Sequence, residues 1–293
     1  MIPWNDRAGR FSPFKMAVFV AVLLPVLWVA AEAWLHLLGA RPLTVALRQI
    51  GLWMIRLLLL TLAITPLRQV LRWPQLITVR RMVGLAVLSY ALLHLSLYVV
   101  DQKFDLWRVA SEIALRFYLT IGMIAIVGLV VLGITSTDGA VRRLGGKAWQ
   151  RLHRIVYGIA VLGALHFFMQ AKSNVYEPTL MAGFLAWLLA YRVMVAWQVK
   201  VDLRSLSILA VLAMLMTAAL EFAWYGFATN IDPTRVFMAN FHFAHGLRPA
   251  WWALIAGFGV AVAQAARQRL FPPQAGKSRA PYRVASASEG IGQ

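Results

Sequence analysis

The chain has 293 residues, of which 61% are apolar and only 14% are charged, and its mean hydropathy is +0.69. Soluble domains are nearer to about 45–50% apolar and about 25% charged, so this composition indicates a membrane protein. The chain contains no cysteine, which excludes disulfides, thiolate-bound metals, iron–sulfur clusters and covalent C-x-x-C-H haem attachment.

Apolar blocks of roughly 17–25 residues, the length that crosses a bilayer core of about 30 Å, follow one another along the chain. They predict an all-α, polytopic transmembrane bundle of about eight helices. The first block follows a polar start without an evident cleavage site, so we expect a retained helix rather than a signal peptide. The predicted spans lie near residues 16–38, 46–65, 82–100, 114–134, 152–171, 178–197, 205–225 and 249–266. We expect four prolines in the connections or in first helical turns: Pro66, Pro74, Pro178 and Pro249.

The formal net charge of +18 is distributed by segment. If the N-terminus is cytoplasmic, the inside segments carry 20 of the 29 basic residues, and the outside segments carry six. Three arginines, Arg48, Arg56 and Arg116, fall within predicted spans. The bias predicts that both termini are cytoplasmic. The basic charge thus reflects membrane topology, and we expect no nucleic-acid partner.

No internal repeat is visible in the sequence. Residues 1–200 are predicted to form one transmembrane domain of six helices. Residues 201–270 would add two further helices behind the short polar joint VAWQVKVDLRSL. Residues 271–293 are rich in Pro, Gly and Ser and are predicted to form a disordered cytoplasmic tail.

Two histidines, His94 and His166, are predicted to lie at similar depth on different helices. Each helix runs from inside to outside, which places His94 about 18 Å and His166 about 21 Å into its span. Two imidazoles at one level can hold a haem iron from both sides. Gly163 and Gly158 on the helix of His166 could let a porphyrin approach the backbone, although close helix packing explains them as well.

A third histidine, His153, lies thirteen residues before His166, hence about 20 Å nearer the cytoplasm and ~220° out of phase. One haem cannot use both, so His153 would serve a second, inner haem. On the helix of His94, the residue at the depth of this inner haem is Arg80. It lies fourteen positions before His94 and ~40° away from it around the helix axis. Arg80 is therefore a candidate for a propionate contact or an unusual ligand, with an ordinary positive-inside arginine as the alternative. His242 and His245 in the outer loop FHFAH lack an evident third metal ligand.

Several blocks of the sequence resemble the MsrQ (YedZ) family of haem-binding membrane subunits. They are ITVRRMVGLAVLSYALLHLSLYV and RFYLTIGMIAIVGLVVLGITSTDGAVRRLGGKAWQRLHRIVYGIAVLGALHFF, together with LLPVLW and LLLLTLAITPLRQ. The resemblance covers about residues 16–197. It implies a ferric-reductase-like transmembrane domain with one or two b-type haems, whose family ligands fall on His94, His153 and His166.

The resemblance also implies a function. Electrons from the quinone pool, or from a cytosolic flavin reductase, would cross the bacterial inner membrane to a periplasmic molybdopterin enzyme that reduces oxidised methionines. FMN is associated with the family, although no segment here reads as a flavin motif. The chain would be an electron-transfer subunit rather than the catalytic one.

Two alternatives remain open from the sequence alone. The first is direct ferric or cupric reduction by a haem b reductase on the same fold. The second is a non-redox transporter or assembly factor whose histidines are structural. The chain has no G-x-G-x-x-G motif after a strand and hence no recognisable nicotinamide domain, so each redox reading needs a separate electron donor.

Overall fold

The computed structural model describes residues 4–5, 8–171 and 174–270, and the predicted tail, residues 271–293, lies outside them. In the described ranges the regular elements are all helices, and eight are long and apolar enough to cross a membrane. The predicted all-α, multi-pass membrane bundle is thereby confirmed.

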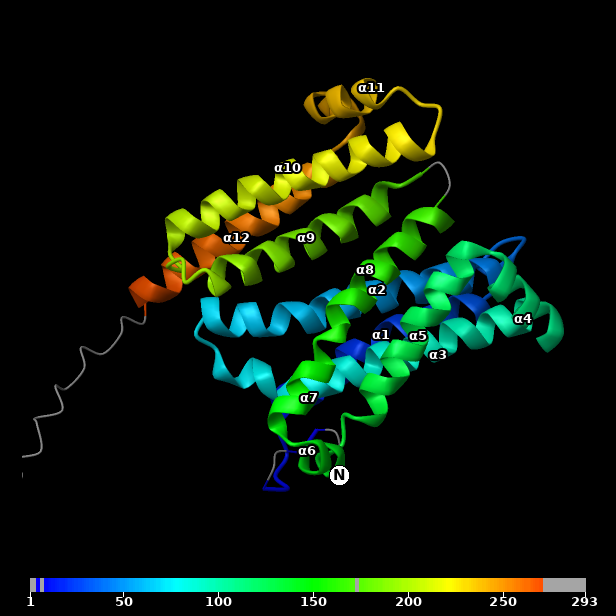
Figure 1. Ribbon diagram of the computed structural model, residues 1–293, viewed down its shortest axis with the longest axis horizontal. Helices are drawn as coiled ribbons and strands as arrows, with labels where there is room; N and C mark the ends of the chain where they lie inside the picture. The colour runs from blue at the N-terminus through cyan, green and yellow to red at the C-terminus, as the bar shows by residue number, and fades with distance from the viewer. Residues whose placement is uncertain (1–3, 6–7, 172–173, 271–293) are drawn as a thin grey trace, which may run out of the picture.

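The described residues form helices α1 to α12 and three short 3-10 turns, arranged as one tilted bundle (Figure 1). Four short elements lie at the bundle ends: α4 (Leu106–Leu115), α6 (Asp138–Leu144), α7 (Gly146–His153) and α11 (Pro233–Met238). The remaining helices are α1 (Pro13–Trp34), α2 (Pro42–Val70), η1 (Pro74–Val79) with α3 (Arg80–Asp101), α5 (Phe117–Ile134), α8 (Ile155–Gln170), α9 (Tyr176–Ala196), α10 (Leu203–Ala228) and α12 (Pro249–Leu270).

Local chemistry explains where several helices begin. Ser12 caps α1 and Asp202 caps α10, where Asp202 and Ser205 form a reciprocal capping box. Proline occupies the first turn of α1, α2 and α12, where its missing N–H costs little. The expectation for Pro66 was wrong, because α2 continues through it to Val70 and Pro66 is buried inside the helix.

Two predicted spans contain breaks. Residues 114–134 were expected to form one helix, but Arg116 has an extended backbone and separates α4 from α5. The carbonyl of Glu112 and the side chain of Glu112 both pair with Arg116 at this corner. The helix expected over residues 152–171 is interrupted at Arg154, which separates α7 from α8.

The core consists of two helix pairs that face each other. Helix α2 packs along α3, and α5 packs along α8, with fewer contacts between the pairs. Large buried side chains between them include Ile50, Leu62 and Val87. Helix α1 is fastened to α3 by Tyr90, whose hydroxyl donates to the Val22 carbonyl at 2.8 Å.

The last two membrane helices form a second layer on α9. Helices α10 and α12 pack closely against each other, and both contact α9. A Cβ added to Gly257 of α12 would lie only 2.5 Å from the Cβ of Ala210, so glycine is what permits this approach. Trp224 of α10 also packs on Phe168 of α8, with ring centroids 4.9 Å apart. Helix α10 is therefore in direct contact with the helix that carries His166.

The two ends of the bundle carry different elements (Figure 1). Helices α6 and α7 lie at the end where α1 begins, and we refer to it as the basic end because it carries Arg142, Arg143 and Lys147. Helices α4 and α11 lie at the opposite end, which we refer to as the α4 end.

Candidate functional site

His94 of α3 is held against the neighbouring helix α2. Its Nδ1 atom lies 3.0 Å from the backbone carbonyl oxygen of Leu47. The same edge of the ring faces Gly51, where an added Cβ would lie 3.0 Å from Cε1 and 3.1 Å from Nδ1. Because Nδ1–H donates to the carbonyl, the lone pair of this imidazole is on Nε2.

His166 of α8 has the same relationship to α5. Its Nδ1 atom lies 2.7 Å from the carbonyl oxygen of Tyr118, and an added Cβ at Gly122 would lie 2.9 Å from both Nδ1 and Cε1. Within the described ranges, neither His166 nor His94 makes a hydrogen bond through Nε2. Both rings therefore keep a metal-ligating nitrogen available.

The two rings line one pocket between the helix pairs, which we refer to as the His94–His166 pocket. Its other walls are apolar and come from α2, α5 and α8: Met54, Ile55, Leu58, Gly122, Ala125, Ile126, Leu129, Ile159 and Gly163. The enclosed volume is ≈ 30 Å³. The structure thus brings together the two histidines that the sequence placed at one depth.

The two glycines of α8 differ in their surroundings. Gly163 lines the His94–His166 pocket, and a Cβ there would touch Ile55 at 3.4 Å. Gly158 is exposed, and an added Cβ would meet no atom within 4 Å. Only Gly163 is therefore placed to bring a ligand near the backbone.

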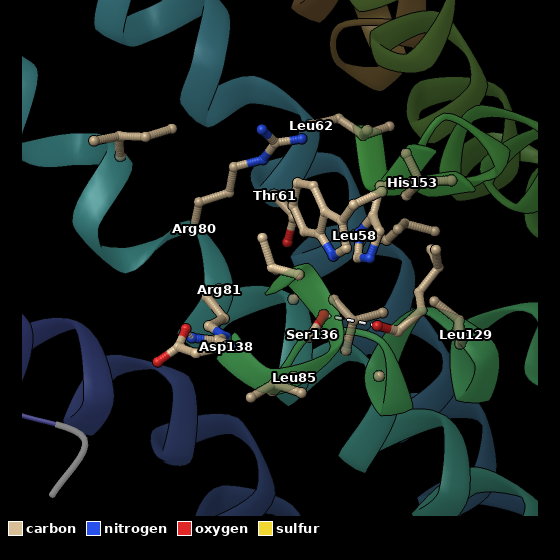
Figure 2. A pocket seen from close by; sticks show the side chains of 18 residues that line it. Leu58, Thr61, Leu62, Arg80, Arg81, Leu85, Leu129, Ser136, Asp138 and His153 are labelled. Carbon is tan, nitrogen blue, oxygen red and sulfur yellow. Dashed lines mark hydrogen bonds and ion pairs between the residues drawn. The ribbon is translucent and has the colours of Figure 1, made fainter. Parts of the chain in front are cut away.

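A larger cavity lies nearer the basic end, and we refer to it as the His153–Arg80 cavity. Its volume is ≈ 390 Å³, within the range of about 300–1,000 Å³ that small-molecule and cofactor sites occupy. Figure 2 shows that Arg80 enters it from α3 and His153 from α7. Leu58 and Leu129 line both spaces, so they form the partition between the cavity and the His94–His166 pocket.

His153 is fixed in a different way from the other two histidines. Its ring stacks on Trp149, with centroids 4.0 Å apart, and its Nε2 lies 3.2 Å from Oγ1 of Thr135. The Thr135 hydroxyl donates to the Val131 carbonyl at 2.7 Å, which leaves its oxygen to accept from Nε2–H. Trp149 is held in turn by donating to the Thr135 carbonyl at 2.8 Å. The Nε2 atom of His153 is therefore engaged by the protein.

Arg80 and Arg81 have different surroundings although they are adjacent in sequence. Arg81 pairs with Asp138 at 2.8 Å, and both of these side chains are largely exposed (Figure 2). Arg80 is half-buried and makes no hydrogen bond or ion pair with any residue that the structure describes. A half-buried guanidinium that faces a cavity without a partner is suited to an anionic ligand group.

Two other arginines of the predicted spans, Arg56 and Arg192, have partners within the protein. Arg56 pairs with Glu177 at 3.2 Å and lies over the ring of Trp53 at 5.0 Å. Arg192 donates to the Leu62 carbonyl at 2.6 Å and to the Tyr157 hydroxyl at 3.0 Å. His242 is exposed, and the described residues contain no cluster of three or more His, Asp or Glu side chains that could hold a metal.

Sequence reasoning missed four residues that hold these rings: Gly51, Gly122, Thr135 and Trp149. The two glycines interrupt apolar runs, 43 and 44 residues before the histidines they contact, and this spacing is visible in the sequence. The role of the backbone carbonyls of Leu47 and Tyr118 cannot be recognised from residue type, because every residue has a carbonyl.

The donor chemistry of the His94–His166 pocket fits a b-type haem. Two neutral imidazoles with available Nε2 atoms could bind the iron of a haem, and the apolar walls suit a porphyrin. Each Nδ1–H is bound to a backbone carbonyl, the outer hydrogen bond that usually orients a metal-ligating histidine.

Comparison with known proteins agrees with these features. Residues 50–164 match the family described as ferric reductase like transmembrane component. A protein-methionine-sulfoxide reductase heme-binding subunit MsrQ from Rhodospirillum rubrum is 46% identical over 193 residues, covering 66% of this chain and 90% of that protein. The MsrQ protein of Herminiimonas arsenicoxydans is 41% identical over 201 residues, covering 68% and 92%. The MsrQ protein of Caulobacter vibrioides is 39% identical over 177 residues, covering 60% and 84%. No solved structure matches the chain. The chain therefore belongs to the MsrQ family of haem-binding subunits of protein-methionine-sulfoxide reductase.

Proposed function

We propose that this protein carries electrons across the bacterial inner membrane to a periplasmic, molybdopterin-containing methionine sulfoxide reductase. Its donor would be the quinone pool or a cytosolic flavin reductase. The observation that carries the proposal is the pairing of His94 and His166 in one apolar pocket, each with Nδ1 bound to a backbone carbonyl and Nε2 available.

His94 and His166 would hold one b-type haem, which would supply reversible one-electron chemistry. The carbonyls of Leu47 and Tyr118 orient the rings and make them stronger electron donors. Apolar side chains such as Ile55, Leu129 and Ile159 exclude water from this site.

The His153–Arg80 cavity is proposed as a second, inner haem site. Its ≈ 390 Å³ volume suits a cofactor, and it contains one imidazole and one unpartnered guanidinium. Arg80 would bind a propionate or serve as an unusual ligand, and His153 would ligate after exchanging its Thr135 contact. The partition of Leu58 and Leu129 would then separate two electron carriers in series.

The orientation follows from charge. The basic end would face the cytoplasm, because the positive-inside bias places Arg142, Arg143 and Lys147 there. The His153–Arg80 cavity would then receive electrons from the cytoplasmic half, and the His94–His166 pocket would deliver them at the periplasmic half. The α4 end is thus the expected docking end for the reductase.

Purification tests the proposal directly. The detergent-solubilised protein should show a Soret band, with sharp α and β bands on reduction, and a pyridine haemochrome assay should identify haem b. The reduced protein should be reoxidised by the periplasmic reductase with methionine sulfoxide, and not by that reductase alone. A colourless protein, or one that reduces ferric or cupric ions directly and ignores the reductase, would contradict it. Flavin fluorescence after denaturation decides whether FMN is bound.

A further inference from the structure

The rings of His94 and His166 are held by two copies of the same local arrangement. In each copy, the Nδ1–Cε1 edge of the ring lies against a glycine of the neighbouring helix. In each copy, the hydrogen-bond acceptor is the carbonyl of the residue four positions before that glycine. The first copy is Leu47, Gly51 and His94, and the second is Tyr118, Gly122 and His166.

The second copy follows the first at a nearly constant spacing of 71, 71 and 72 residues. His153 follows Arg80 by 73 residues, so the two polar groups of the larger cavity fit the same offset. The helices involved are the pairs α2/α3 and α5/α8. The core is therefore a structural repeat of two helix pairs, although no repeat is visible in the sequence.

The geometry of a helix explains why glycine is required at this position. A helical side chain leans toward the N-terminus and covers the turn before its own Cα, which here contains the carbonyl four residues earlier. A methyl group at Gly51 would approach Nδ1 of His94 to 3.1 Å, and one at Gly122 would approach Nδ1 of His166 to 2.9 Å. These distances are well inside the ~3.5–4.0 Å of ordinary carbon contacts. The ring could then remain only by shifting away from the carbonyl.

We infer that Gly51 and Gly122 are positioning residues for the axial histidines, because they open a backbone carbonyl that fixes the tautomer and orientation of each ring. The inference rests on the proposed haem function. It adds to that function a role for two glycines that contact the histidine rings but not the iron. These glycines would control how strongly each Nε2 atom donates electrons.

The hydrogen bond from Nδ1–H increases the electron donation of Nε2 and favours the oxidised, more positively charged iron. If a methyl group lengthens or breaks this bond, the reduction potential of the haem rises. A glycine that serves only helix packing would instead affect stability without changing the haem. Gly257 is such a glycine, since it faces Ala210 in the α10–α12 interface.

The experiment uses the full-length, haem-loaded protein in detergent. The variants Gly51→Ala and Gly122→Ala are compared with Gly158→Ala, which meets no atom, and with Gly257→Ala, which disturbs packing away from both histidines. The readouts are the redox titration of the α band, the g values of the low-spin signal in electron paramagnetic resonance, and the thermal midpoint. Wild-type haem content tests the proposed function separately.

We expect a higher reduction potential and altered g values in Gly51→Ala and Gly122→Ala, with the larger effect in Gly122→Ala because the clash is closer. Loss of the low-spin signal in a folded Gly122→Ala protein supports the same assignment. Both control variants should keep the wild-type potential and g values. Unchanged spectra in Gly51→Ala and Gly122→Ala would overturn the inference. So would failure of both to fold, because the glycines would then serve general packing.

Discussion

The Nε2 atom of His153 lies 3.2 Å from the hydroxyl oxygen of Thr135, whereas the Nε2 atoms of His94 and His166 make no hydrogen bond within the described part of the chain. Two histidines thus have Nε2 available for a metal, whereas His153 must first give up its contact with Thr135 to ligate through Nε2. A hydrogen bond of this kind contributes about 0.5–1.5 kcal/mol. The two candidate sites therefore differ in how readily they are expected to take up haem.

Replacing Thr135 by valine should increase haem occupancy in the His153–Arg80 cavity. Valine keeps the shape of threonine but cannot accept the hydrogen bond from Nε2. The apparent affinity of this site for haem should rise by up to ~10-fold, which corresponds to about 1.4 kcal/mol. The measurement is the haem-to-protein ratio at limiting haem. Ser136→Ala is the matched control, because Ser136 lines the same cavity and its hydroxyl donates to Leu132 instead. An unchanged ratio in Thr135→Val would argue against Nε2 ligation by His153.

Replacing either His94 or His166 by alanine should abolish the low-spin haem of the His94–His166 pocket. Each variant removes one of two axial ligands and leaves an apolar pocket with no substitute. His153→Ala should lower haem content only partially if two haems bind, and leave it unchanged if one does. The control is His242→Ala, whose side chain is exposed in the loop after α11. Full low-spin haem in both His94→Ala and His166→Ala would rule out this pairing.

Arg80 and Arg81 both line the larger cavity, and they allow a matched comparison of an arginine without a described partner and one that is paired with Asp138. Arg80→Gln should reduce haem retention in the larger cavity, because it removes the guanidinium that faces an anionic group there. Arg81→Gln breaks only an exposed ion pair with Asp138, which contributes about 0–1 kcal/mol, and should leave haem unchanged. Arg80→Lys separates the two roles, since lysine can partly replace a propionate contact but not guanidinium ligation. Equal haem content in Arg80→Gln and Arg81→Gln would assign Arg80 to membrane topology alone.

The sequence was sufficient to predict eight membrane spans and to predict that His94 and His166 lie at a similar level. Span positions follow from apolar length, and the depth of His94 and His166 follows from 1.5 Å per residue, so neither needs tertiary information. Helix ends were less predictable, as Pro66 shows. Its missing N–H was expected to end α2, but the helix continues to Val70. Tertiary packing of a buried proline decided this point, and a sequence pattern does not report it.

The orientation of the rings was not predictable from residue letters. It depends on the carbonyls of Leu47 and Tyr118, which every residue possesses, and on glycines whose role appears only when a neighbouring helix is placed. The break at Arg154 was missed for a similar reason. The carbonyl and hydroxyl of Thr135 contact Trp149 and His153, which both lie on α7 before the break. Contacts between distant residues set that geometry.

Tyr90→Phe should destabilise the attachment of α1 to α3. The Tyr90 hydroxyl donates to the Val22 carbonyl at 2.8 Å and accepts from the Val26 N–H at 3.1 Å, so it completes one turn of α1 beside Pro25. Phenylalanine leaves both backbone groups without this partner in an apolar environment, a loss of about 1–3 kcal/mol. The thermal midpoint in detergent should fall, whereas Tyr98→Phe, which lies two turns further along α3, should change it little. An unchanged midpoint in Tyr90→Phe would show that α1 closes this turn by itself.

The most buried ion pair among the described residues joins Glu221 of α10 to Arg248, directly before α12, with side-chain exposures of 3% and 29%. The Glu221 carboxylate is buried, so replacing it leaves the partly buried Arg248 without its partner, which costs up to about 3–5 kcal/mol. Glu221→Gln should therefore lower the thermal midpoint markedly. Glu177→Gln is the control, because Glu177 pairs with Arg56 at 39% exposure and should cost at most about 1 kcal/mol. The double variant Glu221→Gln with Arg248→Gln should recover part of the loss, because no unpaired charge remains.

Trp224, one turn after Glu221, packs on Phe168 near His166, so the haem spectrum of these variants reports whether α10 also supports the His94–His166 pocket. If Glu221→Gln is no more destabilising than Glu177→Gln, the pair does not hold the loop before α12 in place.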